Sequence, residues 1–213
     1  MQIKGASGFL QQWRMLEATG LECVRQGRSL FKALGFTLAA GERLRIAGVN
    51  GSGKTSLLRI LCGLLAPNSG EVRWKNSPIG SLREEYSREI VYLGHAPAVK
   101  DDLTAAENLA IACRLAGFSV DPREALQRLG VSGDVPVRKL SQGQRRRAAL
   151  ARLVVSERVP LWLLDEPYAA LDKQATALVD ELIAAHAARG GAVVFTTHQE
   201  TGAAASRVIE LHA

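Results

Sequence analysis

Residues 48–55, with the sequence GVNGSGKT, fit the pattern G-x-x-x-x-G-K-[ST] and contain an additional glycine at position 51. A strand-like run, RLRIAGV, leads into this segment, and a helix-like run, TSLLRIL, leaves it. Glycines let backbone N–H groups converge on phosphate oxygens, and the following helix N-terminus adds a partial positive charge. This pattern predicts a polyphosphate site, with the candidate nucleotide-binding residues Gly48, Asn50, Gly51, Ser52, Gly53, Lys54, Thr55 and Ser56.

Four side chains are expected to hold the phosphates, a magnesium ion and the attacking water at this site. Lys54 would bridge the β- and γ-phosphates, and the Thr55 hydroxyl would ligate Mg²⁺. The apolar run LWLL ends on Asp165-Glu166, and such a strand delivers carboxylates to the sheet edge where ligands bind. Asp165 is predicted to hold Mg²⁺ through water, and Glu166 to act as the general base. An acidic pair after an apolar run is also typical of a solvated strand end, so this prediction depends on the phosphate loop.

A motif further along the chain narrows the class of nucleotide-binding protein. The Asn-Lys-x-Asp tetrapeptide that would select guanine is absent, whereas LSQGQ at 140–144 differs by one residue from LSGGQ. With these motifs the chain resembles the nucleotide-binding subunits of ABC transporters. YAALD at 168–172 resembles the loop that couples the two halves of an ABC dimer, and His198 matches the switch histidine, a catalytic residue. The resemblance covers roughly residues 20–210 and implies a P-loop ATPase with Mg²⁺ as cofactor.

The LSQGQ segment predicts a second phosphate-binding helix end. Ser141 and the amides of Gly143 and Gln144 would form it, and a role for Ser141 as the N-cap is compatible with phosphate binding. A single fold cannot easily bring this helix end and the Lys54 loop to one γ-phosphate, whereas two copies arranged head to tail can. We therefore expect a homodimer that forms when ATP binds.

Two positions depart from the common ABC pattern. ABC ATPases usually have Gln at the end of the strand after the first helix, where this chain has His95, which could contact the magnesium ion and the attacking water. The region ahead of the phosphate loop, CVRQGRSLF, contains no Tyr to stack on adenine. Arg25 or Arg28 could lie over the base instead, and Phe31 is a second candidate.

These departures resemble the ATP-binding subunits of cytochrome c maturation, or haem export, ABC systems. The segments that carry the resemblance are LECVRQGRSLF, LLRILCGLLAPNSGEVRW and YLGHAPAVKDDLTAAENL. It implies integral-membrane partner subunits, a peripheral place on the cytoplasmic face of a bacterial inner membrane, and a role in haem delivery. The helical block at about 96–140 is then the expected coupling surface, with residues 95–103 nearest the membrane partner. No haem-ligating Cys-x-x-Cys-His occurs, so the residues themselves do not identify the cargo.

The composition leaves two other functions open. One is an ABC ATPase that drives a different transporter. The other is a non-transport ABC protein acting on nucleic acid, which only the net charge of +6 supports. Such proteins commonly carry coiled-coil insertions or two nucleotide domains, and this chain of 213 residues shows neither. We therefore expect no nucleic-acid partner.

Strands that alternate with helices predict an α/β fold with a mainly parallel core sheet, and the resemblance adds an antiparallel β subdomain. We expect an ABC nucleotide-binding domain over 20–213, with its core at 20–95 and 141–213. An inserted helical subdomain is expected at about 96–140.

Two segments each fit two interpretations. Residues 1–19 form an expected N-terminal extension, in which Phe9, Leu10, Trp13 and Leu16 share one helical face. A short docking helix or a poorly packed terminus fits this pattern, and the second is favoured. Residues 145–147 are three consecutive arginines. We expect them on a solvated helix face, and contact with an acidic partner or lipid headgroups is the alternative.

Overall fold

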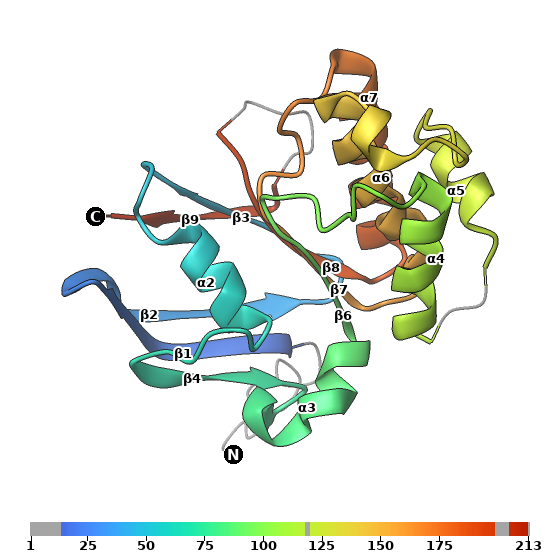
Figure 1. Cartoon of the computed structure of the whole chain (residues 1–213). Coiled ribbons are helices and arrows are strands. Elements are labelled where there is room, and N and C mark those ends of the chain that lie inside the picture. The colour runs from blue at the N-terminus through green and yellow to red at the C-terminus, as the bar shows by residue number, and fades with distance from the viewer. Residues whose placement is uncertain (1–13, 118–119, 199–204, 213) are drawn as a thin grey trace.

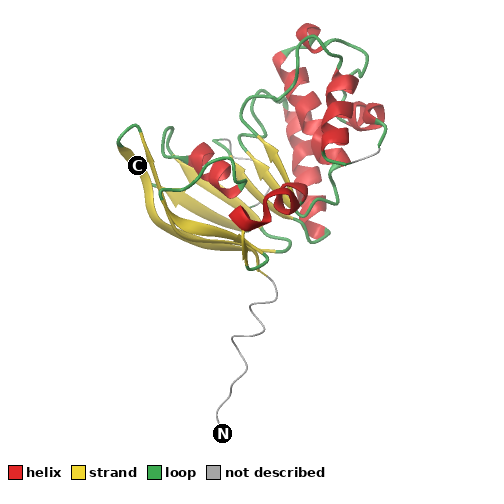
Figure 2. Ribbon diagram, turned by 60° about the horizontal axis from the view of Figure 1, so that its bottom comes forward, coloured by secondary structure: helices red, strands yellow, loops and turns green. Residues whose placement is uncertain are grey.

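The computed structural model describes residues 14–117, 120–198 and 205–212. Two sheets and a group of helices make up this part of the chain (Figure 1). One sheet is antiparallel, in the order β2-β1-β4-β5, and the other is parallel, in the order β6-β7-β8-β3-β9. Most of the helices stand together at one end of the strands (Figure 2). Among the described residues, no helix combines the length and the apolar character needed to cross a membrane.

The antiparallel sheet comprises β1 (Arg14–Arg25), β2 (Arg28–Ala39), β4 (Ser69–Trp74) and β5 (Ser77–Pro78). The parallel sheet comprises β3 (Arg43–Gly48), β6 (Ile90–Leu93), β7 (Leu161–Leu164), β8 (Ala192–Thr196) and β9 (Arg207–Leu211). The helices are α2 (Lys54–Leu61), α3 (Ile79–Arg88), α4 (Ala105–Leu115), α5 (Pro122–Arg128), α6 (Gln142–Val155) and α7 (Lys173–Ala188). A 3₁₀ turn at Val137–Lys139 leads towards α6.

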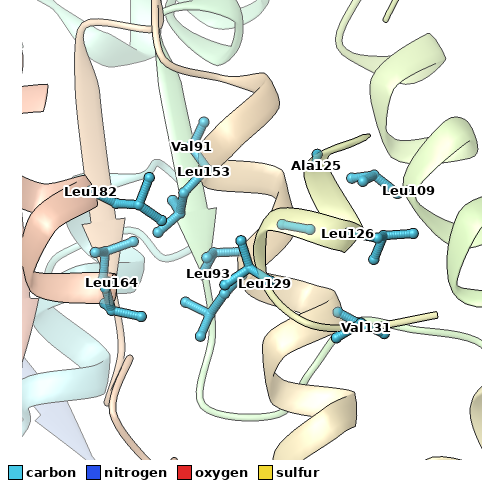
Figure 3. Close-up of a cluster of buried hydrophobic side chains, with 14 of the residues drawn as sticks. Val91, Leu93, Leu109, Ala125, Leu126, Leu129, Val131, Leu153, Leu164 and Leu182 are labelled. Carbon is cyan, nitrogen blue, oxygen red and sulfur yellow. The ribbon is translucent and has the colours of Figure 1, made fainter. Parts of the chain in front are cut away.

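Strands β7 and β8 of the parallel sheet are buried on both faces, which explains why they are apolar except for Thr196 at the end of β8. Every residue of β7 and β8 is buried. Because side chains alternate along a strand, Trp162 and Leu164 pack with helices α4 to α7, whereas Leu161 and Leu163 pack with α2 and the antiparallel sheet. Figure 3 shows part of the first of these two cores, where residues of β6, β7, α4, α5, α6 and α7 meet. The sheet thus separates two groups of helices.

Three expectations about elements need correction. Strand β1 begins at Arg14 and Leu16 is fully buried, so the extension does not reach residue 19, and Leu16 lies in a strand rather than a docking helix. Phe9, Leu10 and Trp13 lie outside the described residues. The apolar residues up to Leu65 predict a first helix over 53–65, but this helix ends at Leu61, because Cys62 and Gly63 close it with turn hydrogen bonds. Helix α3 was not expected at all, since its sequence IGSLREEYSR buries only Tyr86.

The helical block lies where the sequence placed it. Helices α4 and α5 fall within residues 96–140, and both pack on α6. Thr104 caps α4 in a reciprocal pair with Glu107, and Asp121 caps α5 ahead of Pro122. The division of the chain into a core and a helical subdomain remains our proposal. Under this proposal α6 belongs to the core, and the N-terminal end of α6 faces the helical block.

Candidate functional site

The phosphate-loop residues lie between the end of β3 and the start of α2. Gly48 has φ 139°, and an added Cβ there would lie 2.6 Å from Leu211 O and from Ser52 Oγ. Gly53 has φ 102°, and its Cβ would meet Leu30 and Phe31 at 3.0–3.2 Å. Both positions therefore need glycine, for conformation and for space. The second contact also shows that strand β2 lies directly beside the loop.

Lys54 points into the loop and contacts its main chain. Its Nζ donates to Gly48 O at 2.7 Å and to Val49 O at 3.0 Å, and the residue is 8% exposed. An ammonium buried to this degree is normally paired with an anion. The two carbonyl groups hold the charge at the mouth of the loop, where an anionic ligand would pair with it.

Ser52 is a second sign that the loop is shaped for a ligand. The residue is fully buried, and among the described residues its Oγ has no hydrogen-bond partner. A buried hydroxyl left unpaired costs about 1–3 kcal/mol. A bound oxyanion would supply the missing acceptor.

Three side chains form a hydrogen-bonded row across the sheet edge. Thr55 Oγ1 donates to Asp165 Oδ2 at 2.8 Å, and Thr196 Oγ1 donates to Asp165 Oδ1 at 2.9 Å. Thr196 Oγ1 also accepts from the backbone N–H of Glu166 at 2.9 Å. Asp165 is only 2% exposed, so these contacts fix the direction of both of its oxygens. Sequence reasoning missed Thr196, although TTH at the end of an apolar strand was a signal for it.

The oxygens of Thr55 and Asp165 fit a magnesium ion that is shared with a nucleotide. Mg²⁺ prefers oxygen ligands, and typically takes one or two from the protein and the rest from phosphates and water. No group of three or more His, Cys, Asp and Glu side chains suited to a metal occurs in the part of the chain that the structure describes.

Glu166 and His198 face each other beside this row. The backbone N–H of His198 donates to Glu166 Oε2 at 3.3 Å, and His198 Nε2 lies 3.4 Å from Glu166 Oε1. Glu166 adopts φ 51°, a conformation that is uncommon for a residue with a side chain. Such strain persists where surrounding contacts over-determine it, often at functional sites. The structure thus brings Lys54, Thr55, Asp165, Glu166 and His198 to one edge of the parallel sheet.

Ser141 lies away from this cluster at the start of α6. Its Oγ accepts from the Gln144 N–H at 3.2 Å, and its own N–H donates to Gln144 Oε1 at 2.9 Å, so the predicted N-cap is confirmed. Helix α6 covers the face of the sheet opposite to α2. Gly143 approaches the main chain of the 168–172 loop so closely that a Cβ would lie 2.9 Å from Ala170 O. The predicted phosphate-binding helix end is therefore on a different face from the loop of the same chain.

The remaining predicted residues have different surroundings. His95 follows β6 and is exposed, and its carbonyl oxygen is held by Arg146. Arg25 and Arg28 pair across the β1–β2 turn and are exposed, at the end of the hairpin that lies beside Gly53. Phe31 is 7% exposed and packs against Gly53, so its ring is not open for stacking on a base. The roles of His95, Arg25 and Arg28 stay predictions.

The expectation for the arginine run was wrong at its middle residue. Arg146 is only 3% exposed, and its guanidinium donates to main-chain carbonyl groups around the acidic pair. Its neighbours Arg145 and Arg147 are partly exposed. The sequence contained a signal, because Arg146 shares a helical face with the buried residues Ala149, Leu150 and Leu153.

Comparisons with known proteins place this chain among relatives. A model of the ABC transporter family matches residues 31–169. The cytochrome c biogenesis ATP-binding export protein CcmA of Aromatoleum aromaticum is 52% identical over 191 residues, covering 87% of this chain and 89% of that protein. The protein of the same name from Nitrosococcus oceani is 49% identical, covering 93% and 92%. A dimeric ATP-binding cassette solved in a post-hydrolysis state with ADP and phosphate is 25% identical, with a TM-score of 0.78 and coverage of 92% and 94%.

Proposed function

Because this chain belongs to the ABC transporter family, we propose that it is the ATP-hydrolysing subunit of a membrane transporter complex. The observation that supports this most directly is the row at the sheet edge. Thr55 lies 2.8 Å from Asp165, and the next residue, Glu166, faces His198. This arrangement supports a Mg²⁺ site at Thr55 and Asp165 and a role for Glu166 as the proton acceptor.

Each residue of the row has a distinct part in hydrolysis. Lys54 binds the β- and γ-phosphate oxygens, and Thr55 with Asp165 would hold Mg²⁺, which when bound neutralises phosphate charge. Glu166 accepts a proton from the attacking water. His198 lies beside Glu166 and orients it or contacts the γ-phosphate. The Thr196 hydroxyl fixes both Asp165 and the Glu166 amide in place.

The complete site takes two copies of the chain. Ser141 and Gly143 of one copy would bind the γ-phosphate that Lys54 of the other copy holds, since within one chain their helices cover opposite faces of the sheet. An ATP bound between two copies stabilises the dimer, and hydrolysis of this ATP allows the dimer to dissociate. Charge stabilisation supplied in trans is worth about 10³–10⁵ in rate where it has been measured for an arginine finger.

The relatives support a specific place for this ATPase. Both are named as export proteins of cytochrome c biogenesis, and they are about half identical to this chain over most of its length. We propose that hydrolysis here serves haem export or the release of a haem-loaded chaperone in the same process. The subunit would act at the cytoplasmic face of a bacterial inner membrane. An ATPase for another cargo is the alternative, since the sequence contains no haem-ligating motif that would identify the cargo.

A groove between α3, α4 and α6 supports docking of an integral-membrane partner. Its volume is about 640 Å³, and it includes Ala98 and Lys100 from the expected coupling segment. Ile111 and Leu115 on α4 add apolar surface, with exposures of 41% and 86%. A cytoplasmic helix of a membrane subunit would cover these side chains. The groove adjoins β6, whose end leads to His95, so partner movement would reach the site by this route.

The first test replaces the proposed base. Glu166→Gln removes the proton acceptor but keeps the side-chain volume, so we expect turnover to fall at least about 100-fold while ATP remains bound. The measurements are phosphate release and gel filtration with ATP and Mg²⁺, in which the variant should elute as a dimer. Glu124→Gln, on the exposed face of α5, is the matched control and should behave as wild type. Normal turnover by Glu166→Gln would remove Glu166 as the base.

The second test addresses the cargo. A host strain without its own copy of this gene is supplied with the wild-type chain or with Glu166→Gln, and covalently bound haem in c-type cytochromes is measured by haem staining. We expect only the wild-type chain to restore the cytochromes. Normal cytochromes in the deletion strain, with an active purified ATPase, would favour a transporter for another cargo.

A further inference from the structure

Arg146 connects two loops at the catalytic edge from a position inside α6. Its Nη1 donates to Gly94 O at 3.0 Å and to His95 O at 3.1 Å, on the loop that follows β6. Its Nη2 donates to Asp165 O at 2.9 Å and to Glu166 O at 2.6 Å, on the loop that follows β7. A longer contact joins Nε to Pro167 O at 3.4 Å. One side chain thus joins a helix to both loops that surround the proposed base.

These contacts use the guanidinium in an unusual way. Among the described residues, its five hydrogen-bond partners are all main-chain carbonyl oxygens, and Arg146 forms no ion pair with a carboxylate. Burial lowers its pKa, while the nearby carboxylates of Asp165 and Glu166 act in the opposite direction. A guanidinium stays charged in proteins, and its planar fork of donors suits several acceptors at once. The shape of Arg146 is therefore matched to the main chain of the two loops.

The two neighbouring arginines of the 145–147 run do not share these contacts with the catalytic edge. Arg145 Nη1 donates to Asp101 Oδ1 at 2.9 Å, and Arg147 Nη1 donates to Leu129 O at 3.3 Å. Both partners belong to the helical block, on the other side of α6. Only Arg146 of the three points to the sheet edge that holds Asp165 and Glu166.

The contact bears directly on the strained residue of the site. Glu166 has φ 51°, its N–H is held by Thr196, and its carbonyl group accepts the shortest of the Arg146 hydrogen bonds. Both ends of this residue are therefore fixed, one from β8 and one from α6. The same helix starts five residues earlier at Ser141, the group that would reach the second nucleotide.

We propose that Arg146 is a positioning residue for ATP hydrolysis, which fixes the loops of His95 and Glu166 to the start of α6 so that they move as one unit. This inference rests on the proposed function. When the Ser141 end of α6 meets a nucleotide on the partner copy, the displacement reaches the Glu166 main chain through one buried side chain. Loss of the Arg146 guanidinium would leave the phosphate loop around Lys54 intact. The Glu166 carboxylate, however, would no longer be held in the geometry that it needs for hydrolysis.

The test separates positioning from binding by kinetics. Arg146→Gln keeps a polar side chain but loses the charged fork, and Arg146→Lys keeps the charge with a single donating group. We expect Arg146→Gln to lower kcat about 10–100-fold, as small misplacements of catalytic groups do. The KM for ATP and the calorimetric Kd for ADP should stay within about threefold of wild type, because Lys54 and Thr55 are untouched. The kcat of Arg146→Lys should lie between those of wild type and Arg146→Gln.

Arg145→Gln is the matched control, because it removes a guanidinium one residue away whose ion pair is with Asp101. Its kcat should stay within about twofold of wild type. If Arg146→Gln does not fold by circular dichroism, Arg146→Lys provides the same comparison of kcat with ADP affinity.

A folded Arg146 variant with wild-type kcat would overturn the proposal. So would equal losses of turnover and ADP affinity, since they would indicate a general structural role. The wild-type chain is assayed first: absence of ATP hydrolysis there would contradict the proposed function, whereas normal wild-type turnover with unchanged Arg146 variants would contradict only the positioning role.

Discussion

At the scale of single residues, the site depends on short polar contacts whose partners have no other way to be satisfied. Asp165 is buried beside Thr55 and Thr196, and its two oxygens receive one hydroxyl each. A buried carboxylate is tolerated only with such partners. The contact from Thr196 also fixes the Glu166 amide, so this hydroxyl holds two functional residues at once.

Thr196→Val tests that hydroxyl at nearly constant volume. The change leaves Asp165 Oδ1 and the Glu166 N–H without this partner, so we expect a loss of about 1–3 kcal/mol in the free energy of unfolding and a lower kcat. Urea unfolding followed by circular dichroism and a steady-state ATPase assay measure the two effects. Thr176→Val, on the half-buried face of α7, is a control of the same chemistry and should lose much less. Equal losses in both variants would contradict the assigned role of Thr196.

At the scale of elements, α7 is attached to the parallel sheet by a buried histidine. His186 on α7 stacks on Trp162 of β7 with ring centroids 3.8 Å apart and an interplanar angle of 8°. The ring is 1% exposed, and an added Cβ on Gly191 would lie 2.2 Å from its Nε2. Glycine at the start of β8 therefore leaves the space that the imidazole fills. Burial lowers the pKa of His186 to about 4, and the nearby charge of Arg189 adds to this effect.

This pKa predicts a pH dependence of stability. An unfolded histidine titrates near 6.5, so between about pH 6.5 and 4 the unfolded chain binds a proton that the folded chain does not. The stability due to neutral His186 is therefore complete above pH 6.5 and decreases as the pH falls towards 4. We expect wild type to lose about 2–3 kcal/mol more than His186→Phe between pH 7 and 4.5.

The measurement is urea unfolding at the two pH values for wild type, His186→Phe and the exposed control His212→Phe. Comparing the change with pH within each protein cancels the direct effect of the substitution on packing. Wild type and His212→Phe should show the same decrease. A decrease of the same size in His186→Phe would show that other groups cause it.

At the scale of the whole molecule, the proposed reaction is divided between two copies of the chain. The Lys54 loop belongs to the α2 side of the parallel sheet, and the Ser141 helix end belongs to the α6 side. A solved dimeric cassette of similar fold shows that such chains pair. The sharing of one nucleotide between Lys54 and the partner's Ser141 is the part that needs a direct test.

Mixing two inactive variants provides that test. Lys54→Ala removes the phosphate ligand, while Ser141→Asp keeps a good N-cap for α6 and repels the γ-phosphate. Each variant alone should have little ATPase activity. In a 1:1 mixture half of the dimers are mixed and contain one intact site, so activity should rise to at most about a quarter of wild type. No rise on mixing, with mixed dimers demonstrated by differently tagged chains, would contradict a shared site.

The sequence by itself determined the residues of the phosphate loop and the acidic pair, the alternation of strands and helices, and the place of the helical block. These follow from local spacing, because a glycine-rich loop, an apolar strand and a capped helix each depend on residues near one another in the chain. Confirmed in this way are the strand before Gly48, the helix that begins at Lys54, the buried run before Asp165 and the cap at Ser141.

Only the tertiary structure decided that Thr196 belongs to the site, that Phe31 packs under Gly53, that β1 begins at Arg14 and that Arg146 is buried. Each of these depends on contacts between segments far apart in the chain, such as that between Arg146 and Asp165, which lie 19 positions apart. Residue types that usually lie in solvent become internal when several strand ends and a helix converge on one edge. Their burial depends on that convergence, which local signals such as the helical face of Arg146 indicate but do not specify.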